Sequence, residues 1–193
     1  RKCWRYGKFN DIKSFNMGFF KDDLKKVRAF IFDVDGVLSR QAQSLTPEGE
    51  LMRTSCTKDG YAIMYSIRKG YIVAVISGGG APGVRERMEK LGLKPEDIYL
   101  KVPNKIEALE EIMERYSLTA DEIMYMGDDI PDYNVMTRVG LPVCPLDACE
   151  EIKGVARYIS DTIGGEGCVR DVMAQVLKAR GDWMDTKCYV KSM

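Results

Sequence analysis

Short apolar runs alternate with segments of helical pattern along this chain, from Arg28 almost to its end. Strand-like runs that are each followed by an amphipathic segment are typical of a parallel sheet with helices on both faces. We therefore predict an α/β fold with a doubly wound, mainly parallel, Rossmann-like sheet. The runs that we assign to strands are residues 28–34, 71–77, 97–102, 122–129 and 140–145.

Helix signals fit between these runs. Asp59 stands where a helix N-cap is expected, Pro82 suits a first helical turn, and Gly70 and Gly92 follow predicted helix ends. Residues 119–122, TADE, have the pattern of a capping box. We predict helices after Asp59, Pro82 and Asn104, and a last helix from about residue 169 to 179.

One segment interrupts the alternation, between the first strand and its helix. There the sequence TPEG at 46–49 separates two extended arms, which predicts a β-hairpin flap over about residues 41–57.

The interval from Asp33 to Ser77 has room for this hairpin and one helix, and the interval from Ser77 to Lys105 for one helix and one strand. We therefore expect no cap domain.

The size of the chain, 193 residues with 45% hydrophobic and 30% charged residues, fits one compact domain, which we expect over 17–193 with a tail at 181–193. Residues 1–16 read as an N-terminal extension.

A net charge of zero gives no general attraction to nucleic acid or an anionic membrane. No apolar run approaches the roughly 20 residues of a membrane span, so we expect a cytoplasmic protein. The scattered cysteines predict reduced thiols.

Histidine is absent from the whole sequence. Its absence excludes Ser-His-Asp triads, Cys-His dyads, imidazole bases and histidine-based zinc sites. Any catalysis must therefore use carboxylates, lysine or a metal ion.

Polar residues gather where the predicted strands end, which is the edge at which an open parallel sheet binds ligands. Several carboxylates on one rim repel each other unless a cation lies among them, and a set of oxygen ligands without His or Cys indicates Mg²⁺. The residues at these ends are Asp33, Asp35, Ser77, Gly78 to Gly80, Lys105, Asp128, Asp129 and Asp132.

A Mg²⁺ site, a lysine, a hydroxyl group and the free N–H groups of a glycine loop together form a receptor for a phosphoryl group. Without histidine, the most plausible nucleophile is a carboxylate, which forms an aspartyl-phosphate. A second acid two residues later, in the pattern DVD, can protonate the leaving oxygen and later take a proton from water.

The motifs DVDGV at 33–37, Ser77, Lys105 and GDDIPD at 127–132 occur in the order of the haloacid dehalogenase superfamily of phosphatases, which this sequence resembles. The segments FDVDGVLS, KDGYAI, ISGGG, MGDDIPDYNVM and GGEGCVRDV are more closely similar to the 3-deoxy-D-manno-octulosonate 8-phosphate (Kdo 8-phosphate) phosphatases. The resemblance covers roughly residues 28–184.

The resemblance implies hydrolysis of Kdo 8-phosphate for lipopolysaccharide synthesis, in a homotetramer whose flaps and C-terminal tails border neighbouring sites, where Trp183 and Met184 could contribute. The resemblance implies that Asp33 is the nucleophile and Asp35 the acid/base. It implies that Ser77 and Lys105 bind the phosphate, to which the glycine loop adds Gly78. The implied Mg²⁺ ligands are Asp33, the backbone carbonyl of Asp35 and Asp128, with Asp129 and Asp132 in support.

The sequence departs from this family at one point. Its members usually carry an arginine soon after the strand-two hydroxyl, where this chain has glycines. Either another cation, such as Lys58, Arg53 or Arg85, holds the carboxylate of a sugar acid, with Lys58 as the first choice, or the substrate preference has changed. A phosphatase for another acidic ketoaldonate phosphate, such as a nine-carbon, sialic-acid-like one, stays open.

The alternative from another class is a signalling receiver domain, which also carries a phosphoaccepting Asp, an acidic Mg²⁺ pair, a hydroxyl residue and a Lys. The order of motifs argues against it. A receiver places its acidic pair at strand one, whereas Asp128 and Asp129 follow strand four here. An acid/base such as Asp35 has no purpose in a phospho-relay.

Overall fold

The computed structural model describes residues 22–184. The predicted extension at 1–16 and the part of the tail beyond Met184 lie outside the described residues. Six strands form one sheet in the order β5-β4-β1-β6-β7-β8, and all its pairs are parallel, which confirms the predicted architecture. The strands are β1 Ala29–Phe32, β4 Ile72–Ser77, β5 Ile98–Leu100, β6 Ile123–Met126, β7 Leu141–Cys144 and β8 Tyr158–Ile159.

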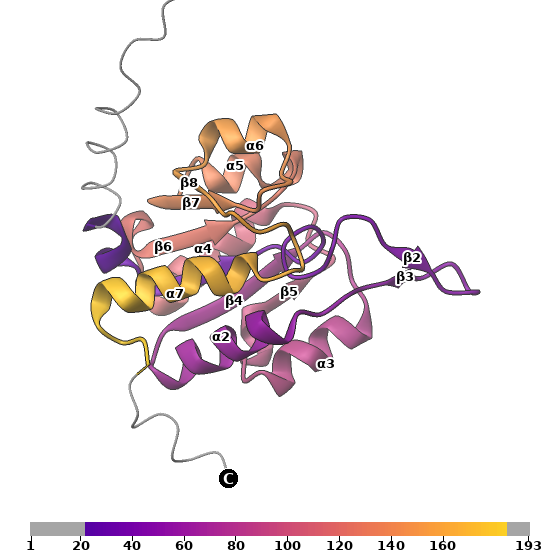
Figure 1. The fold of residues 1–193 in the computed structure, drawn as a ribbon, viewed down its shortest axis with the longest axis horizontal. Coiled ribbons are helices and arrows are strands. Elements are labelled where there is room, and N and C mark those ends of the chain that lie inside the picture. The colour runs from indigo at the N-terminus through magenta and orange to yellow at the C-terminus, as the bar shows by residue number, and fades with distance from the viewer. Residues whose placement is uncertain (1–21, 185–193) are drawn as a thin grey trace, which may run out of the picture.

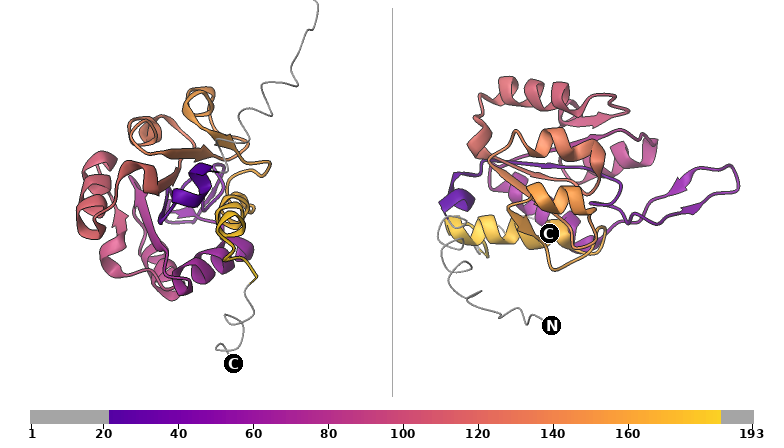
Figure 2. Two further views of the ribbon diagram at one scale, coloured as in Figure 1. Left: turned by 90° about the vertical axis from the view of Figure 1, so that its left-hand side faces the viewer. Right: turned by 90° about the horizontal axis from the view of Figure 1, so that it is seen from above.

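Helices cover both faces of this sheet (Figures 1 and 2). On one face lie α2 Thr57–Arg68, α3 Pro82–Lys90 and α7 Cys168–Arg180. On the other lie α4 Lys105–Tyr116, α5 Tyr133–Met136 and α6 Glu150–Val155. Short 3₁₀ turns lead into β5, β6 and α5, and they are η1 Pro95–Asp97, η2 Ala120–Glu122 and η3 Ile130–Asp132.

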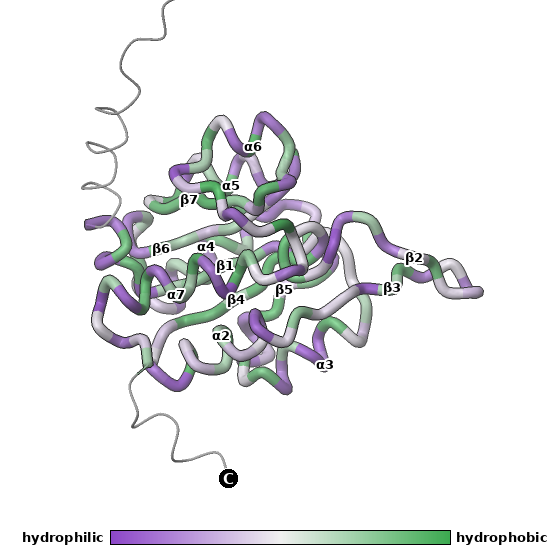
Figure 3. The backbone as a smooth tube through the Cα atoms, viewed as in Figure 1, coloured by the Kyte–Doolittle hydropathy of each residue, from purple (hydrophilic) through white to green (hydrophobic). Residues whose placement is uncertain are grey.

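The central strand β1 is buried on both of its sides. Phe30 and Phe32 point into the core beneath α2 and α7, while Ala29 and Ile31 point into the core on the face of α4. A strand covered on both faces needs apolar residues at every position, which explains the unbroken run AFIF. The hydropathy colours show the same arrangement, with the most apolar backbone in the central strands (Figure 3).

Most of the predicted helix boundaries are confirmed. Pro82 is the first residue of α3, Gly70 and Gly92 take positive φ angles of 88° and 101° after their helices, and the capping box at 119–122 is present at η2. The prediction for Asp59 is wrong: the N-cap of α2 is Cys56. The Asp59 carboxylate instead accepts a hydrogen bond of 2.7 Å from the backbone N–H of Arg170 at the start of α7, which a sequence pattern does not reveal.

The predicted hairpin is present and projects from the body of the molecule (Figure 1). It consists of β2 Ser44–Leu45 and β3 Leu51–Met52, paired antiparallel. At its base, Ser39 Oγ accepts a hydrogen bond from the Thr54 N–H at 2.9 Å. The flap is therefore tied to the loop that follows β1. Within the described part of the chain, none of the helices has the length and apolar character needed to cross a bilayer.

Candidate active site

The carboxyl ends of the parallel strands carry the predicted polar residues to one edge. Asp33 follows β1 directly, Ser77 ends β4, Lys105 begins α4, and Asp128 and Asp132 follow β6. Parallel strands end at the same edge of a sheet, so these side chains meet although they are far apart in sequence. They line a cavity of about 530 Å³ together with Asp35, Gly78, Gly79 and Asp129.

A buried lysine links two of the acids. Lys105 Nζ lies 2.9 Å from Asp33 Oδ1 and donates a hydrogen bond of 2.7 Å to Asp132 Oδ1. The fully buried Tyr125 donates its hydroxyl to the same Asp132 oxygen at 2.6 Å, and the Asp128 N–H donates to the other at 3.2 Å. Both carboxylate oxygens of Asp132 are thus engaged by protein groups, which makes Asp132 an anchor for Lys105 and for the loop after β6.

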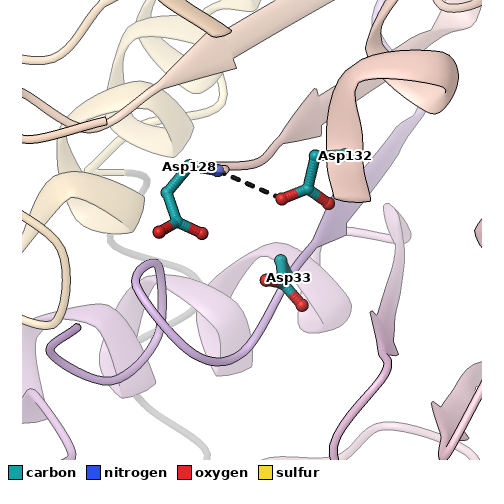
Figure 4. A group of neighbouring side chains, drawn as sticks. All are labelled: Asp33, Asp128 and Asp132. Carbon is teal, nitrogen blue, oxygen red and sulfur yellow. Dashed lines mark hydrogen bonds between the residues drawn. The ribbon is translucent and has the colours of Figure 1, made fainter. Parts of the chain in front are cut away.

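The acids Asp33, Asp128 and Asp132 approach closely enough to share a cation, because one carboxylate oxygen from each lies within 4.8 Å of the others (Figure 4). Burial, together with repulsion from Asp132 and against the pull of Lys105, raises the pKa of Asp33 to about 7. Burial likewise raises the pKa of Asp128 to about 7, opposed by a hydrogen bond from Gln41. These observations fit a divalent cation that takes oxygen ligands, such as Mg²⁺.

The second acid of the DVD pattern is held by the flap. Arg53 donates hydrogen bonds from Nε to Asp35 Oδ1 and from Nη2 to Oδ2, both at 2.8 Å. Gln43 Nε2 adds a third at 2.8 Å to Oδ1. A second glutamine of the flap base, Gln41, donates to Asp128 Oδ2 at 2.9 Å. The flap thus contacts both the acid/base candidate and a metal-ligand candidate.

Sequence reasoning missed several of these contributors. Gln41 and Gln43 follow the DVDGV motif on the flap, and their position so close to the two acids was the one available signal. Tyr125 is an apolar-looking member of β6, and Asp147 and Cys149 line the cavity from the loop after β7. No spacing rule marks residues of these kinds as parts of a site.

The glycine run lies beside the acids Asp33 and Asp35 at the edge of the cavity. The Gly79 N–H donates to Ser77 Oγ at 3.2 Å, and Gly78 and Gly79 line the cavity. A Cβ atom at position 79 would lie 3.1 Å from both Asp35 Oδ2 and Arg53 Nη2. Any side chain there would press on this ion pair, so glycine leaves the space that the pair occupies.

Two predicted substrate-binding cations lie elsewhere. Lys58 lines a shallow depression with Tyr61 and Arg170, and Arg85 donates to the backbone carbonyls of Pro95 and Ile98. The structure does not bring either of them to the acidic cavity. Of the three predicted cations, Arg53 contacts it.

A parallel sheet with this acidic rim indicates a haloacid dehalogenase-like hydrolase. Comparison with known proteins supports this class. The family model of the haloacid dehalogenase-like hydrolases matches residues 92–170. The chain is 33% identical over 163 residues to the 3-deoxy-D-manno-octulosonate 8-phosphate phosphatase of Salmonella typhi, covering 84% of this chain and 86% of that protein. The homologous phosphatase of Escherichia coli K12 matches with the same identity and coverage.

Solved structures of Kdo 8-phosphate phosphatases have the same fold as this chain. The Kdo 8-phosphate phosphatase of Yersinia pestis superimposes with a TM-score of 0.80 at 31% identity, covering 84% of this chain and 86% of that one. The enzyme of Moraxella catarrhalis, crystallised with a magnesium ion, a phosphate ion and Kdo, does so with a TM-score of 0.82 at 28% identity, covering 86% and 95%. The chain belongs to the Kdo 8-phosphate phosphatase family of the haloacid dehalogenase-like hydrolases, which sets the receiver alternative aside.

Proposed function

We propose that the protein is a Mg²⁺-dependent phosphomonoesterase that hydrolyses Kdo 8-phosphate to Kdo and phosphate, in the synthesis of lipopolysaccharide precursors. The observation that carries the proposal is the convergence of Asp33, Asp128 and Asp132 at the carboxyl edge of the sheet, where Lys105 contacts the first and the last of them. The relatives named as phosphatases of this ester support the choice of substrate.

In the proposed reaction, a carboxylate oxygen of Asp33 attacks phosphorus, and the bond between phosphorus and the sugar oxygen breaks. Asp35 gives its proton to that leaving oxygen. A water molecule then attacks the phosphorus of the aspartyl-phosphate, Asp35 takes the proton of the water, and the bond between Asp33 and phosphorus breaks. Free Asp33 and inorganic phosphate result, so the carboxylate is regenerated in each cycle.

The other groups hold the phosphoryl oxygens. Lys105 supplies a positive charge, and Ser77 with the N–H groups of the glycine loop supplies neutral donors. Asp33, the backbone carbonyl of Asp35 and Asp128 are the proposed ligands of Mg²⁺, with Asp129 and Asp132 nearby. When bound, Mg²⁺ offsets the charge that develops on the phosphoryl oxygens.

The substrate assignment is tested by a panel of sugar phosphates with purified protein and Mg²⁺. We expect kcat/KM for Kdo 8-phosphate to exceed that for hexose 6-phosphates by at least about 100-fold, because a neutral sugar lacks the carboxylate that a cation of the site would hold in the transition state. A nine-carbon ketoaldonate phosphate belongs in the panel as the second candidate. Equal activity on hexose phosphates and Kdo 8-phosphate would remove the assignment.

We also propose a homotetramer assembled through the flaps. Leu45, Leu51 and Met52 are 62%, 44% and 54% exposed on the hairpin, an apolar surface on a short sheet with open edges. Trp183 itself packs on Tyr65 within the same chain, with ring centroids 5.3 Å apart.

Light scattering should give four times the chain mass, and the mass should fall when Leu51 and Met52 are both replaced by Ser. A monomer at micromolar concentration would contradict the proposal.

A further inference from the structure

In this structure the flap occupies both oxygens of the acid/base candidate. Arg53 forms a bidentate pair with Asp35, at 2.8 Å for each contact, and Gln43 bonds one of the same oxygens. The side chains of Arg53 and Asp35 are 14% and 33% exposed, so the pair is accessible from the mouth of the site. A carboxyl group that delivers a proton has to free the oxygen that carries it. The observed pair therefore has to loosen before Asp35 can serve the leaving oxygen.

The cations near the acidic cavity are few. Among the described residues that line it, Lys105 is the one cation, and it is already engaged by Asp33 and Asp132. Arg40, at the base of the flap, pairs with Glu166. Arg53 reaches the cavity from outside through its contact with Asp35, and a guanidinium can hold any carboxylate in the same bidentate way.

We propose that Arg53 is a specificity-determining residue that exchanges one carboxylate for another: it holds Asp35 in the free enzyme and the carboxylate of the sugar acid in the complex. The inference rests on the proposed function, because it needs a substrate that bears both a phosphoryl and a carboxylate group. The exchange replaces one bidentate pair with another of the same chemistry, so little pairing energy is lost. Asp35 then keeps the Gln43 bond to Oδ1, and its Oδ2 is free to serve the leaving oxygen.

An uncharged sugar phosphate offers Arg53 no such partner, and Asp35 stays held by the flap. Selection for the acid thus acts on the rate of the chemical step as well as on binding, because the interaction that frees Asp35 forms only with the correct substrate. Glycine at position 79 leaves room for the pair of Arg53 and Asp35, since a Cβ atom there would lie 3.1 Å from each partner.

The test compares two primary phosphate esters with alkoxide leaving groups, Kdo 8-phosphate and the neutral sorbitol 6-phosphate. We expect Arg53→Gln to lower kcat/KM for Kdo 8-phosphate by about 10- to 100-fold, as expected for loss of a charge-assisted pair. The same variant should leave kcat for sorbitol 6-phosphate unchanged or higher, because the bidentate contact that Arg53 makes with Asp35 is lost. Arg53→Lys, which keeps the charge but not the fork geometry, should restore part of the activity on Kdo 8-phosphate.

Arg138→Gln is the matched control, because Arg138 pairs with Glu110 on the surface and its loss should alter neither ester. Equal losses on both esters with Arg53→Gln, or no loss on either, would overturn the exchange while leaving the proposed function intact. Failure of the wild-type protein to hydrolyse Kdo 8-phosphate would overturn both proposals. A crystal structure with Kdo and inorganic phosphate provides a direct view, in which Arg53 should contact the Kdo carboxylate rather than Asp35.

Discussion

Asp33→Asn should abolish turnover while the fold persists. The amide cannot attack phosphorus as a carboxylate does, and removal of a nucleophile elsewhere lowers kcat by on the order of 10⁴- to 10⁶-fold. Asn has nearly the shape of Asp, so the sheet and its helices should form as before. The measurements are kcat with Kdo 8-phosphate at saturating Mg²⁺ and the circular dichroism spectrum of the same sample.

The control for this prediction is Asp161→Asn, which makes the same chemical change at an exposed position in the loop after β8. It should retain wild-type activity. Retained activity in Asp33→Asn would refute the assignment of the nucleophile, and loss of its helical spectrum would show that Asp33 acts on folding instead.

Without metal, the contribution of Asp33 and Asp128 to the stability of the wild-type protein should fall as the pH rises from about 4 to about 7. The pKa values of Asp33 and Asp128 are raised by burial from 3.8 to about 7, so over this range the folded state holds protons that the unfolded state has released. Stability gained from this difference is fully present below the unfolded pKa and is lost as the pH passes the folded one. At pH 8 both carboxylates are buried and charged, and Mg²⁺ should raise the melting temperature by binding them.

Asp128→Asn should change this behaviour in a defined way. The metal-free variant should melt at a higher temperature than wild type at pH 8, because one buried charge is gone, and its pH dependence between 4 and 7 should be shallower. The rise on adding Mg²⁺ should shrink or vanish, and phosphatase activity should fall by at least about 100-fold, as for loss of a group that stabilises transition-state charge. Thermal melts with and without Mg²⁺ at pH 5 and pH 8 measure the melting temperature, its pH dependence and its response to Mg²⁺. A phosphatase assay measures the fall in activity.

Asp121→Asn serves as the surface control for these melts, since Asp121 is exposed at η2. Its pH dependence and its response to Mg²⁺ should match wild type. A full Mg²⁺ shift in Asp128→Asn would remove Asp128 from the proposed metal ligands, and a pH dependence between 4 and 7 as steep in Asp128→Asn as in wild type would contradict the assigned protonation of Asp128.

The parallel sheet and the positions of the acids could be predicted because both depend on local patterns. A strand buried on both faces must be apolar, and residues that directly follow parallel strands must share an edge. The residues at the ends of β1, β4 and β6 therefore meet whatever the details of the helices. The elements that escaped prediction, α5, α6 and β8, have four, six and two residues, too few to show a period.

The location of Lys58 could not be predicted, because it depends on how α2 is rotated about its axis. Lys58 and Asp59 are neighbours on this helix and point about 100° apart. Asp59 is buried against α7, where it binds the N–H of Arg170, and that contact turns Lys58 toward a separate depression. The role of Arg53 depends on the path of the flap, which no sequence period describes.

The loop around Gly164 has a consequence for how the protein is made. The Gly165 N–H donates to the Val37 carbonyl at 2.8 Å, and Gly164 lies so close to the Gly36 carbonyl that a Cβ atom there would overlap it. The turn that follows the proposed nucleophile Asp33 is thus held by residues synthesised more than a hundred positions later. On the ribosome, a nascent chain that has emerged only through β7 already contains every proposed catalytic acid but lacks these contacts from the loop around Gly164. Catalytic competence should therefore arise late in translation, after the segment leading into α7 has left the exit tunnel.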